Sequence, residues 1–181
     1  MKPSPYFTDH FRYFFKRFSS QESLFSWFVK RAGNTTEAFS FPDVLKGMPR
    51  TLVFLPRDIV WVSGFLKSLP QQFIQISKFC VHDTLQSTVS SFKGKAFYYS
   101  DSECRYGEGA FVSLEKKIKE FAPQVCIYLD EPFLPRLYLA QVSGAVCRIG
   151  FHSESFYPFL NLSLHPEKSS EAELICQYYG V

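Results

Sequence analysis

The feature that most constrains the fold is a series of five short apolar runs between residues 52 and 151, most of them followed by a helical pattern. The first run, Leu52–Leu55, contains no polar residue and is closed by Pro56. Such a run is typical of a strand that is buried on both faces of a parallel sheet. The five predicted strands are residues 52–55, 73–80, 96–99, 124–129 and 147–151.

Helices are expected between these strands. Leu114 and Ile118 recur at helical spacing, for example, with charged residues on the opposite side. The predicted helices are residues 58–69, 83–92 (a helix or a loop), 112–121, 134–142 and 169–179, the last of them ending at Gly180. The alternation indicates right-handed crossovers and predicts an α/β fold, a Rossmann-like three-layer α/β/α domain with a five-stranded parallel sheet.

The segment before this pattern is rich in aromatic residues. Ten of the first 31 residues are aromatic, and the same stretch holds six Lys or Arg against two acids. We expect helices within residues 6–31 that either lie on an anionic membrane surface or pack on the main domain. The predicted units are a helical, basic, aromatic-rich extension and linker over 1–48, a Rossmann-like domain over 49–165, and a C-terminal helix or linker over 166–181.

Composition excludes several classes of protein. The chain of 181 residues is 46% hydrophobic and 20% charged, which favours a packed core over disorder. Its net charge of +3 arises in residues 1–50, which hold eight Lys or Arg and four Asp or Glu. The main domain therefore lacks an extended basic stripe, and nucleic acid is not an expected partner.

Membrane and redox signals point to a cytoplasmic protein. No apolar run reaches the roughly 18 residues that a membrane-spanning helix requires. The five cysteines include no C-x-x-C pair, so we expect buried free thiols and no zinc site.

Polar side chains follow two of the strands, at the edge where ligands collect in open α/β sheets. Asp58 stands at the start of the helix after the first strand and is either a general base or only a helix N-cap. Its neighbour Arg57 is a candidate for substrate binding. Asp130 and Glu131 follow the fourth strand as candidates that orient a sugar, but two adjacent carboxylates are a weak metal signal.

The fifth strand contributes two further candidates. Arg148 either pairs with an anion of the substrate or forms a buried structural salt bridge, and His152 follows the strand as a second substrate contact. The nucleotide motifs G-x-x-x-x-G-K-[ST] and G-x-G-x-x-G and the nucleophile motif G-x-S-x-G are absent. We therefore expect neither a cofactor nor a metal.

From about Pro49 to Val181 the order of features resembles the N-terminal half of glycosyltransferase family 9, the lipopolysaccharide heptosyltransferases. The most specific piece is the block Arg-Ile-Gly-Phe at 148–151, which follows a small residue and Gly-Ala as it does in the family. The segments that resemble family features are residues 52–60, 65–70, 121–129, 142–151, 161–165 and 173–180.

The resemblance implies one half of a GT-B enzyme, in which a first Rossmann-like domain holds the sugar acceptor and a second holds the nucleotide sugar. Such enzymes invert the anomeric centre without a metal. The resemblance assigns to Asp58 the role of the base that deprotonates the acceptor hydroxyl. The pattern departs from the family here, because Arg57 replaces a Gly and Gly64 replaces a Pro.

The chain ends where the second domain of the family would begin, so we expect an acceptor-side domain that does not transfer sugar alone. Its acceptor would be a sugar or lipid-linked sugar of lipopolysaccharide or a surface polysaccharide, and its partner a second GT-B half. We expect it in the cytoplasm or peripherally on the inner membrane. The alternatives are a non-catalytic binding or scaffold module, and a membrane-surface adaptor that acts through residues 6–31.

Overall fold

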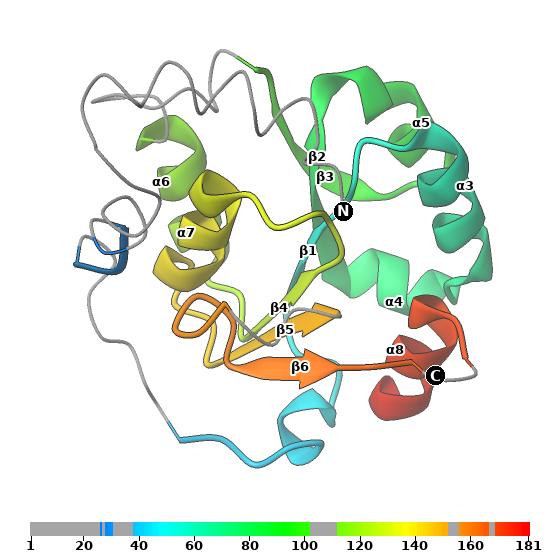
Figure 1. Ribbon diagram of the computed structural model, residues 1–181. Helices are drawn as coiled ribbons and strands as arrows, with labels where there is room; N and C mark the ends of the chain where they lie inside the picture. The colour runs from blue at the N-terminus through cyan, green and yellow to red at the C-terminus, as the bar shows by residue number, and fades with distance from the viewer. Residues whose placement is uncertain (1–25, 27, 31–37, 102–111, 152–155, 167–168) are drawn as a thin grey trace.

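The computed structural model describes residues 26, 28–30, 38–101, 112–151, 156–166 and 169–181. These residues form a single parallel sheet with helices on both of its faces (Figure 1). The strands are β1 (Thr51–Phe54), β2 (Ser77–His82), β3 (Lys95–Tyr99), β4 (Val125–Tyr128), β5 (Cys147–Phe151) and β6 (Leu162–Leu164). The predicted α/β class with a parallel sheet is therefore confirmed.

The sheet has six strands, so the prediction of five is wrong. β6 adds to the outer edge of β5 in parallel, with Leu162 opposite Ile149. It is only three residues long and is half-buried throughout. A strand of this length at the edge of a sheet carries too few apolar residues to be distinguished from a loop by its sequence.

The helices confirm most of the predicted pattern. They are α3 (Ile59–Ser68), α4 (Gln71–Ile76), α5 (Gln86–Ser91), α6 (Val112–Phe121), α7 (Leu134–Val142) and α8 (Glu171–Tyr179), with short 3-10 helices η1 (Asp43–Leu45) and η2 (Asp83–Leu85). α8 ends at Gly180, whose left-handed conformation (φ 70°) closes the helix as predicted.

One predicted strand begins too early. Residues 73–76 belong to α4, and β2 starts only at Ser77. Phe73 and Ile74 are buried in the core on one face of the sheet, but they belong to a helix and not to a strand. A short apolar run fits a buried helix as well as a buried strand, and Pro70 before it starts the helix.

Two apolar cores, one on each face of the sheet, explain the unbroken apolar strands. Leu52 and Phe54 of β1 face a core that includes α6 and α7, whereas Val53 faces a core that includes α3, α4, α5 and α8. Alternate residues of a strand point to opposite faces. Each residue of β1 is thus buried, as a central strand of a three-layer fold requires.

The segments outside the central pattern share these cores. Phe28 is 2% exposed and its ring lies 5.5 Å from that of Tyr138 on α7. Leu45 of η1 is buried in the core of the opposite face. Phe28 is the only aromatic residue of 6–31 whose side chain lies within the described part, and the rest of the predicted aromatic extension lies outside it.

Three of the four described cysteines, Cys80, Cys126 and Cys147, are buried, and Cys126, Cys147 and Cys176 are free thiols. Burial raises the pKa of Cys147 to about 12, so this thiol stays protonated and unreactive. Within the described part of the chain, no helix has both the length and the apolar character needed to cross a membrane.

The strand order β3-β2-β1-β4-β5-β6 determines where a site can form. From β1 the chain adds β2 and then β3 on one side. It then crosses to the other side of β1, where it adds β4, β5 and β6 in turn. The loops that follow β1 and β4 therefore diverge to opposite sides of the sheet. Ligands of open α/β sheets bind in the crevice at this switch point.

Candidate functional site

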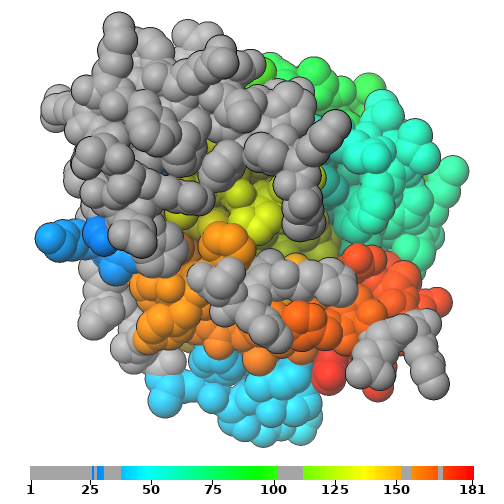
Figure 2. All heavy atoms as spheres, in the orientation of Figure 1, coloured from blue at the N-terminus to red at the C-terminus, as the bar shows by residue number. Residues whose placement is uncertain are grey.

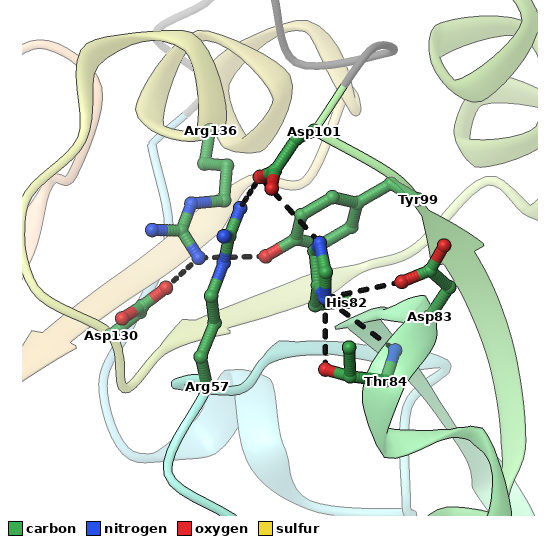
Figure 3. A network of polar contacts seen from close by, with 8 residues as sticks. All are labelled: Arg57, His82, Asp83, Thr84, Tyr99, Asp101, Asp130 and Arg136. Carbon is green, nitrogen blue, oxygen red and sulfur yellow. Dashed lines mark hydrogen bonds and ion pairs between the residues drawn. The ribbon is translucent and has the colours of Figure 1, made fainter. Parts of the chain in front are cut away.

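Polar side chains from four neighbouring strands converge at the carboxyl edge of the sheet (Figure 3). His82 and Tyr99 are the last residues of β2 and β3, while Arg57 and Asp130 follow β1 and β4. We call this group the edge network, and its members are Arg57, His82, Asp83, Thr84, Tyr99, Asp101, Asp130 and Arg136. Figure 2 shows the surface around the end of β4 (yellow-green) set back between α3 (turquoise) and β6 (orange).

Arg57 and His82 meet at one carboxylate oxygen. Arg57 Nη2 lies 2.5 Å from Asp101 Oδ1, and His82 Nε2 lies 3.5 Å from the same atom. Arg57 follows Pro56 at the end of β1, so its side chain emerges at the carboxyl edge of the sheet. The aspartate thus bridges the loop after β1 and the end of β2.

Two guanidinium groups lie near the ring of Tyr99. The Cζ atoms of Arg57 and Arg136 are 5.9 Å and 5.8 Å from the centre of its ring. Arg136 Nη1 also donates a hydrogen bond of 2.8 Å to the Tyr99 hydroxyl. Because guanidinium groups are attracted to aromatic rings, Tyr99 holds both arginines near the switch point.

The hydroxyl of Tyr128, the last residue of β4, forms hydrogen bonds with the backbone of the loop that follows this strand. Tyr128 donates a hydrogen bond to the carbonyl of Glu131 and accepts one from the backbone N–H of Phe133. Burial raises the pKa of Tyr128 to about 12, so its hydroxyl keeps the proton that it donates. This loop presents Asp130 to Arg136, and the two side chains form an ion pair.

His82 is a buried titratable residue of the network. Its side chain is 9% exposed, and Nδ1 lies 2.9 Å from the Thr84 hydroxyl and 3.2 Å from Asp83 Oδ1. Burial, and then the charge of Arg57, lower the pKa of His82 from its ordinary value of 6.5, while Asp101 and Asp83 oppose the shift. The ring is therefore neutral at neutral pH.

Asp58 lies outside the edge network and caps α3. Its Oδ1 accepts hydrogen bonds from the backbone N–H groups of Val60 (2.9 Å) and Trp61 (3.0 Å). The residue is exposed to solvent. The predicted N-cap role is present, and because both bonds go to one oxygen, the other oxygen of the carboxylate remains available to a ligand.

Arg148 is a structural residue of β5. It is 1% exposed, and its guanidinium donates to the carbonyls of Phe159 (2.8 Å), Ala145 (2.7 Å) and Pro158 (3.1 Å). Burial lowers its pKa. The arginine thus fastens the segment before β6 to β5 through backbone carbonyls, in place of the carboxylate partner that a buried salt bridge would use.

The structure brings together two of the six predicted site residues, Arg57 and Asp130, which are joined through Tyr99 and Arg136. Glu131 is exposed beside Asp130, and Asp58 is exposed beside Arg57. Arg148 lies in the interior, and His152 lies outside the described residues.

Sequence reasoning missed six members of the network, namely His82, Asp83, Thr84, Tyr99, Asp101 and Arg136. A signal was present for two of them, because His82 and Tyr99 end or closely follow predicted strands and so must lie at the carboxyl edge. Asp101 and Arg136 enter through loop and helix geometry that no spacing reveals.

The described residues contain no group of three or more His, Cys, Asp or Glu side chains arranged to hold a metal ion. Comparison with known proteins finds no match to a family model, to a curated protein or to a solved structure.

Proposed function

We propose that this chain is the acceptor-side domain of a heptosyltransferase-like glycosyltransferase of the GT-B type, with a Rossmann-like fold. It binds a sugar or lipid-linked sugar at the carboxyl edge of the sheet. The observation that carries the proposal is the convergence of the edge network at the switch point between β1 and β4, directly beside the exposed carboxylate of Asp58. The resemblance to glycosyltransferase family 9 supplies the reaction class.

The polar groups suit a sugar. Sugar hydroxyls both donate and accept hydrogen bonds, and the edge offers carboxylates at Asp58 and Glu131 as acceptors and the guanidinium group of Arg57 as a donor. The buried ring of Tyr99 lies near both arginines and helps to fix their positions.

Asp58 is the proposed general base. It takes the proton of the acceptor hydroxyl through the carboxylate oxygen that does not cap α3, while the hydroxyl oxygen attacks the anomeric carbon of the donor. The bond from that carbon to the diphosphate oxygen breaks at the same time, and the nucleoside diphosphate leaves with the electron pair. The nucleotide sugar is held by a second GT-B domain, which belongs to the same or to a partner protein. Transfer by this chain requires that domain.

The proposal is tested by calorimetric titration of the full chain with a lipopolysaccharide core oligosaccharide. We expect saturable binding that weakens about tenfold or more in the double variant Asp58→Asn/Glu131→Gln, because two charged acceptors are lost. The matched control is Glu120→Gln, an exposed carboxylate at the opposite, amino edge of the sheet, near the end of α6.

Binding that is absent in the wild-type chain contradicts the proposal. So does binding that weakens equally in Glu120→Gln, because the effect would then follow net charge and not the carboxyl edge.

A non-catalytic binding module with the same fold is a second candidate, and one observation favours it. Asp58 already has a structural role as the cap of α3. The two candidates differ when transfer is reconstituted with a donor domain, because only the enzyme loses its rate in Asp58→Asn.

A further inference from the structure

We propose that Arg57 and His82 form a binding site for the phosphate group of a phosphorylated ligand, and that Asp101 occupies this site in the ligand-free chain. The inference deepens the proposed function, on which it rests for the nature of the larger ligand. It adds that the acceptor carries a phosphate monoester, and that the carboxylate of Asp101 competes with this phosphate for the site.

The first argument is the convergence of two donors on one oxygen. Asp101 Oδ1 lies 2.5 Å from Arg57 Nη2 and 3.5 Å from His82 Nε2. These two side chains come from the loop after β1 and from the end of β2, which are adjacent strands of the sheet, and both point toward the carboxylate (Figure 3). A phosphate group centred near Oδ1 could place one oxygen against each of the two donors.

The second argument is an imbalance in exposure. The side chain of Asp101 is 49% exposed, whereas those of Arg57 and His82 are 20% and 9% exposed. The donors are therefore fixed in the structure, while their acceptor faces solvent. An exposed carboxylate loses little when it returns to water, so an external anion can replace it.

The third argument is the unmet capacity of His82. Its side chain is more than nine-tenths buried, and Nε2 makes no hydrogen bond in the structure, with Asp101 Oδ1 at 3.5 Å beyond good geometry. Buried polar atoms normally have a partner. A phosphate has more oxygen atoms than a carboxylate, and a tetrahedral group can reach both donors at once.

Positive charge near the site favours an anion. Arg57 lies over Tyr99, which fixes its guanidinium at the edge. Arg136 lies over the same ring, but Asp130 is its ion-pair partner. Of the two carboxylates, Asp101 beside Arg57 is 49% exposed and Asp130 beside Arg136 is 7% exposed, so Asp101 is the one that an external anion can replace.

The test is calorimetric titration of the full chain with inorganic phosphate, with acetate in a parallel arm. In Asp101→Asn the competitor loses its charge, and we expect phosphate to bind about tenfold more tightly than to the wild-type chain, as for a site that is otherwise occupied in nine of ten molecules. The imidazole nitrogen signals of His82 should shift during this titration. Acetate that binds as tightly as phosphate assigns the site to carboxylates and overturns the phosphate assignment.

The matched control is Asp43→Asn. Asp43 pairs with Lys46 at 2.5 Å, the same distance as the pair of Asp101 and Arg57. The side chains of Asp43 and Lys46 are both exposed on the surface. Equal tightening in both variants would attribute the effect to net charge and overturn the proposal, as would an unchanged affinity in Asp101→Asn.

Arg57 supplies the second variant. Arg57→Gln in the Asp101→Asn background should weaken phosphate binding about tenfold or more, with Arg57→Lys intermediate because an ammonium lacks the two-pronged donor geometry. Unchanged binding in Arg57→Gln overturns the proposal.

These titrations separate the two claims. Phosphate binding without oligosaccharide binding would refute the proposed function and retain this site. If the chain binds the oligosaccharide with an affinity that neither Asp101→Asn nor added phosphate changes, the phosphate site is refuted and the proposed function is retained.

Discussion

Tyr179, in the last turn of α8, donates a hydrogen bond of 2.7 Å to the hydroxyl of Thr51, the first residue of β1. The direction follows from Thr51, whose single hydroxyl proton is donated to the carbonyl of Pro49 at 2.9 Å. Both side chains are buried, and burial raises the pKa of Tyr179, so the phenol stays protonated. The bond joins positions 128 residues apart and fastens the last helix to the central strand.

Removing this bond should lower stability by about 1 kcal/mol, the usual contribution of a hydrogen bond that is buried. We expect this loss for Tyr179→Phe in urea unfolding. The control is Tyr178→Phe on the same helix, whose ring packs on Phe41 and whose hydroxyl is in no hydrogen bond among the described residues. Losses of equal size in the two variants would contradict the assigned role.

Arg148→Met should destabilise the fold by at least about 3 kcal/mol. Two buried carbonyls and the half-buried carbonyl of Pro158 lose their donor, and each buried unsatisfied group costs about 1 to 3 kcal/mol. Arg50→Met is the control, because Arg50 is exposed and such substitutions change stability by about 0.5 kcal/mol at most. Urea unfolding measures both. A loss below 1 kcal/mol in Arg148→Met would show that the carbonyl contacts are dispensable.

Asp58 allows its two roles to be separated. Asp58→Ala removes the cap of α3 and should cost about 1 kcal/mol of stability, whereas Asp58→Asn keeps a capping oxygen and should cost little. When transfer is reconstituted with a nucleotide sugar and a complementing donor domain, Asp58→Asn should still lower the rate by orders of magnitude, because an amide cannot accept the hydroxyl proton. If the transfer rate of the complemented enzyme is unchanged by Asp58→Asn, Asp58 is a helix cap only.

Stability should fall as the pH falls through the ordinary histidine range near 6.5, because of His82. Burial, and then Arg57, lower the pKa of this ring in the folded chain, so the unfolded chain binds the proton first. Stability is therefore full above pH 6.5 and is lost below it, by up to about 1.4 kcal/mol per pH unit. The charged and titratable groups that face the ring are Arg57, Asp83, Tyr99, Asp101 and Arg136.

The measurement is urea unfolding between pH 5 and 8, and the wild-type loss should exceed that of His82→Gln. His165→Gln, an exposed position, is the control and should follow the wild type. Direct titration of the His82 ring by NMR gives an independent value if His82→Gln unfolds. A pKa above 6.5 would contradict the burial argument.

The sequence predicted the central strands because they are buried on both faces and therefore apolar without interruption, as in Leu52–Leu55. The same logic failed at α4, where Phe73 and Ile74 are buried by a helix, and at β6, where three half-buried residues leave no pattern. Arg57 and Asp130 were predicted from their positions after strands. Their connection through Tyr99 and Arg136 depends on how α7 packs beside β4, and periodicity contains no information about such packing.

The most direct test of the central claim is an NMR titration of the full chain with a lipopolysaccharide core oligosaccharide, with backbone amide shifts as the readout. We predict saturable shifts at the carboxyl edge, around Arg57, Asp58, Tyr99 and Glu131, and none at the amino edge around Gln124. Saturable shifts confined to the amino edge, or no saturable shifts at all, would contradict an acceptor site at the switch point.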